Sequence, residues 1–197
     1  MRIRTEITGR RTAVEGREAL VLERALPASL ERAWKAISTD EGLSPWIGEL
    51  ETTPAEDGGL PKVRFRMTSE SPDAEWDDVD LRACEPRERV ELVTANGWHL
   101  GMKLAATGPE SAALRFVHRL PEPSDLEGVD WIGIGWEYYL DRLERSLAGD
   151  DPSEISWERG GYEELRREYG DLFGLRADSD AAAVLNTAEA ERAESSE

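Results

Sequence analysis

Residues 124–149 read SDLEGVDWIGIGWEYYLDRLERSLAG, and this stretch says most about the fold of the chain. Large apolar side chains recur in it at steps of three and four residues, which places them on one face of a helix. They are Val129, Ile132, Trp136, Tyr139, Leu140, Leu143 and Leu147. Ser124 and Glu127 have the spacing of a capping box at its start, and Gly149 supplies a stop. A helix with this much apolar surface must bury it against another element.

The segments before this helix predict its partner, because apolar and polar residues alternate in them as in strands with one buried face. The expected strands cover 19–26, 46–52, 62–68, 77–83, 89–94, 98–105 and 112–120. After the first of them, Ser29 is expected to cap one helix and Asp40 a second, short helix at 41–46. The prediction is an α+β fold in which a curved antiparallel sheet packs against the long C-terminal helix.

The chain of 197 residues suits one domain with extensions better than two domains. The expected parts are an N-terminal extension at 1–16, the main domain at 17–149, a linker with a short amphipathic helix at 150–176, and an acidic disordered tail at 177–197. Within the first part, the alternation of Ile3, Thr5 and Ile7 is typical of an edge strand.

The charge balance limits the partners that the chain can bind. It holds 42 acidic and 24 basic residues, a formal net charge of -18, so nucleic acid and anionic membrane surfaces are not expected. No run reaches the roughly 18 apolar residues that a membrane span needs. We therefore expect a cytoplasmic protein, either a monomer or a homodimer.

Neither a metal site nor a cofactor is expected. The single cysteine, Cys84, rules out an internal disulfide and any site with several cysteine ligands. Glu75, Asp77, Asp78 and Asp80 lack the spacing of a calcium loop, and alternate acidic residues are usual on the wet face of a strand. No nucleophile lies in a recognisable catalytic motif, so no catalytic residue is assigned.

Four motifs, in order, resemble a known family. LVLERALPASLERAWKAISTDEGLSPW (residues 20–46) resembles the opening of bacterial SRPBCC proteins related to the activator of heat-shock-protein-90 ATPase. The matching positions are Arg24, Ala28, Trp34, Ala36, Ile37, Ser38, Asp40, Leu43 and Trp46. VDLRACEPRERVEL, LRFVH and GWEYYLDRL are similar to the family's central strand pair, seventh strand and final helix. Gly101 departs from the family, in which many members carry a larger or polar residue there.

This resemblance implies a START-like helix-grip fold, with the curved sheet wrapped around the final helix and two short helices after the first strand. Such folds can hold a pocket between helix and sheet. The candidates for its lining are Trp34, Trp46, Phe65, Met67, Trp98, Leu100, Met102, Phe116, His118, Trp131 and Tyr139. They would suit a flat or apolar ligand, and the alternative is an ordinary aromatic core, to which we assign Trp136.

His118 is the most informative single residue, because the alternation of its strand turns the imidazole toward the apolar face. It could act on a ligand as a hydrogen-bonding or acid–base group, or be a buried histidine satisfied by neighbouring groups. His99 falls on the opposite, solvated face. Gly133 and Gly135 lie inside the helix and lack the context of a phosphate loop, so we expect them to allow a close approach of the helix to the sheet or a ligand.

The sequence favours non-catalytic binding of a small hydrophobic or aromatic molecule between sheet and helix. The resemblance also implies a co-chaperone-like activator of a heat-shock ATPase, which would make another protein the partner. A cyclase- or hydratase-type enzyme using His118 is the third alternative.

Overall fold

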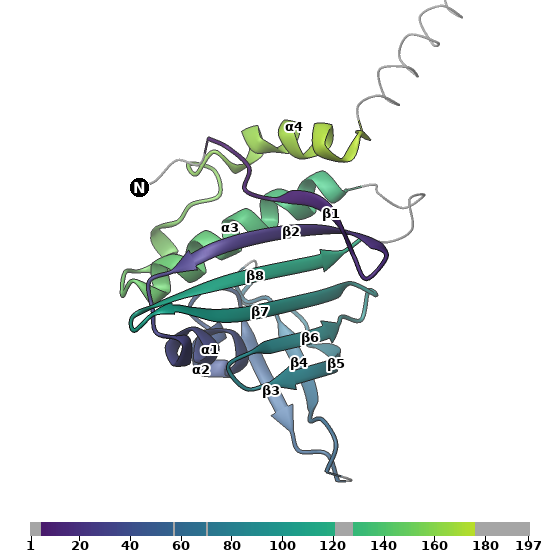
Figure 1. The fold of residues 1–197 in the computed structure, drawn as a ribbon, viewed down its shortest axis with the longest axis vertical. Helices are drawn as coiled ribbons and strands as arrows, with labels where there is room; N and C mark the ends of the chain where they lie inside the picture. The colour runs from purple at the N-terminus through teal and green to yellow at the C-terminus, as the bar shows by residue number, and fades with distance from the viewer. Residues whose placement is uncertain (1–4, 57, 70, 121–127, 176–197) are drawn as a thin grey trace, which may run out of the picture.

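The computed structural model describes residues 5–56, 58–69, 71–120 and 128–175 of the chain. Its strands form one eight-stranded antiparallel sheet in the order β1-β2-β8-β7-β6-β5-β4-β3 (Figure 1). The strands are β1 Arg10–Val14, β2 Arg17–Leu26, β3 Glu49–Thr53, β4 Lys62–Arg66, β5 Asp77–Glu85, β6 Arg89–Val93, β7 His99–Gly108 and β8 Ser111–Arg119. The helices are α1 Leu30–Ser38, α2 Asp40–Leu43, α3 Val129–Leu147 and α4 Tyr162–Phe173. The expected α+β fold with a large antiparallel sheet is confirmed.

The alternation of apolar and polar residues sets which side of the sheet each residue faces. His118 lies opposite Leu20 on one neighbouring strand and Leu100 on the other, and the same row continues through Leu92 and Leu81. We call this side, which carries α3, the inner face (Figure 1). A one-residue shift would expose every member of the row, so burial of this face fixes the register.

The edge strand differs from its predicted position. It covers Arg10–Val14, within the predicted extension at 1–16 but after Thr5 and Ile7, and it pairs with β2 through a tight turn; Ile3 lies outside the described residues. That turn places Glu15 and Gly16 at positive φ values of 51° and 79°. The hairpin turn, rather than the upstream alternation, therefore decides which residues form the strand.

The start of α2 differs from its prediction. Thr39, not Asp40, caps α2: its side chain accepts from the N–H of Gly42 at 3.1 Å. The Asp40 carboxylate instead accepts from the N–H of Leu50 at 2.8 Å, which ties the helix to β3. The cap of α1 is Ser29, as predicted.

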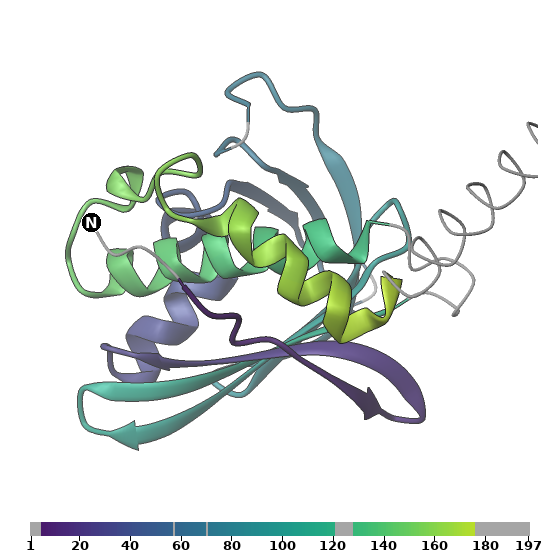
Figure 2. The ribbon, with the colours of Figure 1, turned by 90° about the horizontal axis from the view of Figure 1, so that it is seen from above.

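The long helix α3 begins one residue after Gly128, whose φ is 82°, so the predicted capping box does not start it. Ser124 and Glu127 lie outside the described residues. Its end agrees with the prediction, because Gly149 follows it with a φ of 85°. The helix packs against β2 and α1 on one side and against α4 on the other, so the sheet, α3 and α4 form successive layers (Figures 1 and 2).

Side chains of α4 belong to the same hydrophobic core as those of the sheet and α3. Tyr162, Leu165, Tyr169 and Phe173 are buried in that core. The spacing of these four residues predicts the amphipathic helix found here. None of the helices in the described residues is long and apolar enough to cross a membrane.

Candidate ligand-binding site

His118 lies at the centre of the inner face and is fully buried. The indole N–H of Trp136 on α3 donates to its Nδ1 at 3.0 Å. A neutral imidazole that accepts at Nδ1 carries its proton on Nε2. That Nε2–H is buried and has no hydrogen-bond partner among the described residues. A buried donor without a partner is costly and uncommon in folded proteins.

Burial keeps this imidazole neutral. Loss of hydration, followed by the nearby His99, lowers the pKa of His118 to about 4. The side chain is therefore uncharged near neutral pH and presents one donor, the Nε2–H. It is suited to hold an acceptor oxygen rather than to serve as a cationic acid.

Aromatic rings surround the imidazole. The ring of Trp98, which precedes β7, packs on it with a centroid distance of 5.0 Å and an interplanar angle of 50°. Phe116 and Trp136 pack with centroids 4.2 Å apart, and Trp136 meets Tyr139 edge-on at 6.2 Å. Trp98 and Trp136 are the rings in direct contact with the imidazole, and the hydrogen bond from Trp136 fixes its orientation.

The inner face is not covered evenly. Its residues on β2 and β8, such as Leu20 and Phe116, are fully buried, because α3 packs on β2. Farther along the sheet, apolar side chains are only half-buried and lie against the edge of the core. They form what we call the apolar band: Leu50, Phe65, Met67, Leu100 and Met102. His118 stands between the buried part and this band, since Leu100 is its neighbour on β7.

The remaining predicted lining residues lie in different surroundings. Trp46 is fully buried in the core, where its indole N–H donates to the carbonyl of Ala36 at 2.9 Å. Trp34 on α1 is half-buried against the same core. Trp131 is 44% exposed, and the guanidinium of Arg166 on α4 lies 4.1 Å from the centre of its ring. The structure therefore places Trp98 and Leu100 beside His118, whereas Phe65 lies on β4, Trp46 lies in the core and Trp131 lies at the surface.

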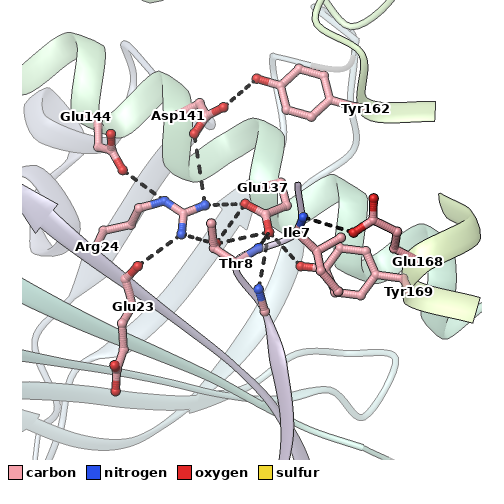
Figure 3. A network of polar contacts seen from close by, with 11 residues as sticks. Ile7, Thr8, Glu23, Arg24, Glu137, Asp141, Glu144, Tyr162, Glu168 and Tyr169 are labelled. Carbon is pink, nitrogen blue, oxygen red and sulfur yellow. Dashed lines mark hydrogen bonds and ion pairs between the residues drawn. The ribbon is translucent and has the colours of Figure 1, made fainter. Parts of the chain in front are cut away.

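A buried polar network on the other side of α3 was not foreseen from the sequence (Figure 3). Glu137 of α3 is fully buried and pairs with Arg24 of β2, which is also buried. Its carboxylate accepts from the N–H of Thr8 at 2.6 Å, from that of Gly9 at 3.3 Å and from the hydroxyl of Tyr169 at 2.7 Å. Arg24 Nε also lies 2.9 Å from Glu144 Oε1.

This network joins four parts of the chain. The N-terminal segment, β2, α3 and α4 all contribute a group to Glu137 or Arg24 (Figure 3). Burial, together with contact with the Glu137 carboxylate, raises the pKa of Tyr169, so its hydroxyl remains a donor. The sequence does carry a signal for the pair: Arg24 lies on the apolar face of its strand and Glu137 within an apolar helix. Opposite charges on two faces that must pack together are expected to meet.

No protein-family model matches the chain, and no curated protein matches it in sequence. Solved structures do match. EF2215 from Enterococcus faecalis, a conserved protein of unknown function, is 18% identical with a TM-score of 0.62, over 83% of this chain and 88% of that one. CalU16 from Micromonospora echinospora is 18% identical with a TM-score of 0.59, over 86% and 95%. The Aha1 dimer from Colwellia psychrerythraea is 19% identical with a TM-score of 0.51, and the match covers 66% of this chain and 95% of that one.

At these identities the likeness is one of fold. The chain shares its α+β fold, an antiparallel sheet packed with helices, with these structures. Folds of this kind serve several functions, so the function must come from the site itself.

Proposed function

We propose that the protein binds, without chemical change, a small hydrophobic or aromatic molecule between the sheet and its C-terminal helix α3. The observation that carries this proposal is the buried Nε2–H of His118, which has no partner among the described residues. A ligand with an acceptor oxygen would satisfy that donor. The adjoining apolar band offers its apolar part a surface that the protein's own side chains cover incompletely.

A flat ligand suits the surroundings of His118. Phe116 and Trp136 are buried against each other, so the ring of Trp98, which is half-buried, is the one on which an aromatic ligand can stack. Because Trp98 is half-buried and packs directly on the imidazole, a ligand reaching His118 must displace or stack on its ring. We therefore assign Trp98 the role of a cover over His118.

Catalysis is less well supported than binding. An enzyme of the cyclase or hydratase kind needs at least two polar groups that converge on the substrate. His118 supplies one, and its row neighbours Leu20, Leu100, Leu92 and Leu81 supply none. The co-chaperone alternative has in its favour only a shared fold with Aha1.

The test compares two ligands of nearly equal size, 2-acetylnaphthalene and 2-ethylnaphthalene, by quenching of tryptophan emission. The wild-type protein should bind both at one site and prefer the ketone by about threefold to tenfold, the worth of one neutral hydrogen bond. His118→Phe should lose that preference and keep the binding. Val117→Thr, which changes the neighbouring residue on the other face of β8, is the matched control. It should keep both the binding and the preference for the ketone.

Two results would contradict the proposal. If neither ligand binds at high micromolar concentration, the inner face is filled by the protein's own side chains. If both bind but His118→Phe leaves the preference unchanged, His118 does not orient the ligand.

A further inference from the structure

The outer face of the sheet, opposite the apolar band, carries a concavity of about 160 Å³ over β6, β7 and β8. Gly101 of β7 and its neighbour Val117 of β8 lie on this face, since they alternate with Leu100 and His118 of the inner face. The concavity thus lies on the other side of the sheet from His118, although Leu100 and Met102 of the apolar band are also among the residues that line it.

Gly101 is not explained by the fold. A glycine inside a strand costs stability, and its usual justification is a positive φ or crowding around the Cα. Gly101 has neither: its φ is not positive, and an added Cβ would meet only Glu91 Cγ at 3.8 Å and Val117 Cβ at 3.9 Å. The remaining reason for glycine in a strand is the close approach of another molecule.

Cationic side chains surround this glycine. Arg89, Lys103 and Arg115 lie directly opposite one another on β6, β7 and β8. Like charges in such register destabilise a sheet, and the same row ends in Glu23 on β2 and Glu85 on β5, which supply part of the counter-charge. The other charged lining residues are the cationic or titratable Arg82, His99 and Arg119 and the acidic Glu15 and Glu91. This excess of cations occurs in a chain of net charge -18.

The ion pairs around the concavity are replaceable. Arg115 pairs with Glu23 at 3.2 Å, and Arg89 pairs with Glu85 at 2.7 Å and with Glu91 at 3.0 Å, all through side chains that are exposed or partly exposed to solvent. Exposed ion pairs of this kind contribute about 0–1 kcal/mol to stability. An incoming anion can therefore replace the carboxylates as the partner of the arginines. Within the described part of the chain, no carboxylate forms an ion pair with Lys103, the central cation of the row.

We propose that this concavity binds a phosphate group, as free phosphate, pyrophosphate or the head of a phosphate ester. Arginine forks match phosphate oxygens in pairs, and a lysine adds a point charge at the centre. A concavity of about 160 Å³ suits one or two phosphate groups rather than a polymer. The negative charge of the rest of the protein disfavours an extended polyanion such as nucleic acid.

The experiment is calorimetric titration of the full chain with pyrophosphate at low ionic strength. One saturable site is expected. Lys103→Gln should weaken it about tenfold, as the loss of one charged contact does. Gly101→Val, which fills the concavity without a backbone clash, should abolish it. Arg64→Gln removes an outer-face arginine of β4 that does not line the concavity, and it should leave the affinity unchanged.

A second arm identifies the source of the phosphate, with vesicles of phosphatidylcholine alone or with added phosphatidic acid. Binding to the mixed vesicles that Gly101→Val removes assigns the site to a lipid headgroup, and binding of pyrophosphate alone assigns it to a soluble molecule. The proposal is overturned if neither arm shows saturable binding at millimolar phosphate. It is also overturned if Arg64→Gln weakens binding as much as Lys103→Gln does, because the attraction would then be a general surface effect.

Discussion

The indole N–H of Trp136 donates to Nδ1 of His118 at 3.0 Å, across the interface between α3 and the sheet. This bond decides the tautomer of the imidazole and so directs its only donor, Nε2–H, away from α3's tryptophan. The helix that closes the core therefore also sets the polarity of the candidate site.

Trp136 should be a large contributor to stability. Replacing this buried aromatic residue by alanine removes its packing on Phe116 and its bond to His118, and we expect a loss of roughly 3–5 kcal/mol. Trp131→Ala is the matched control on the same helix, and because Trp131 is exposed it should change the free energy of unfolding far less. Urea denaturation measures both, and similar losses would show that the helix face has been assigned wrongly.

The pKa of His118 predicts how stability depends on pH. The folded-state value of about 4 lies below the ordinary value of 6.5, so the unfolded chain binds this proton more readily. The stabilisation from a neutral His118 is complete above the unfolded pKa and is lost as pH falls toward the folded one. Between pH ~7.5 and ~5.5 the free energy of unfolding should therefore fall by about 1 kcal/mol.

Comparison of the wild type with His118→Phe isolates this contribution, because the variant lacks the titrating group. Its unfolding free energy should fall less over the same pH range, while His99→Gln should leave most of the wild-type slope in place. Parallel pH curves for wild type and His118→Phe would mean that the imidazole titrates normally in the folded state.

The two glycines of α3 should respond in opposite ways to alanine. A Cβ on Gly133 would lie 2.4 Å from Cδ1 of Tyr169, whose buried ring cannot move without breaking its bond to Glu137. We expect Gly133→Ala to destabilise the protein by about 1–3 kcal/mol. A Cβ on Gly135 meets nothing within 4 Å, so Gly135→Ala should stabilise it by about 0.5–1 kcal/mol.

Thermal unfolding of the two variants is a direct comparison, since both add one methyl group to the same helix. A loss of stability in both variants would show that the helix needs flexibility at this point. A gain at both would place Tyr169, and with it α4, farther from α3 than the structure does.

Breaking the buried ion pair should be costly. Glu137→Gln leaves Arg24 buried without its main counter-charge, and such changes cost about 3–5 kcal/mol. Glu144→Gln removes a more exposed partner of the same guanidinium and should cost about 1 kcal/mol or less. Denaturant unfolding gives the two values, and limited proteolysis should show earlier cleavage around residues 7–9 and 162–173 in Glu137→Gln only. Equal losses of unfolding free energy in the two variants would show that the pair of Arg24 with Glu144 stabilises the protein as much as the pair with Glu137 does.

The sequence predicted the sheet well because period-two alternation is set by burial of one face, which the structure preserves. It placed the edge strand within residues 1–16 but not at its actual residues, and it misplaced the starts of α2 and α3, because short polar segments offer several side chains that can cap or turn. Thr39 and Asp40 are both good caps, and only the position of β3 shows that the Asp40 carboxylate is used elsewhere.

The candidate site was predicted in part. Alternation placed His118 on the apolar face, but its unpaired Nε2–H depends on which residue of α3 reaches Nδ1, and that follows from packing between segments. The close approach expected at Gly133 exists, although the neighbour is Tyr169 of α4 rather than the sheet or a ligand. Partners separated by 32 residues or more, like those of Glu137, cannot be read from local spacing.

The network around Glu137 also has a consequence for how the protein is made. Thr8 reaches this carboxylate from 129 positions earlier in the chain, and Tyr169 from 32 positions later. During synthesis the sheet and α3 emerge from the ribosome before α4, so the nascent chain holds Glu137 with one donor still missing. Maturation is complete only when α4 arrives, and a product ending before residue 162 would expose both a charged group and an apolar helix face to proteases and chaperones.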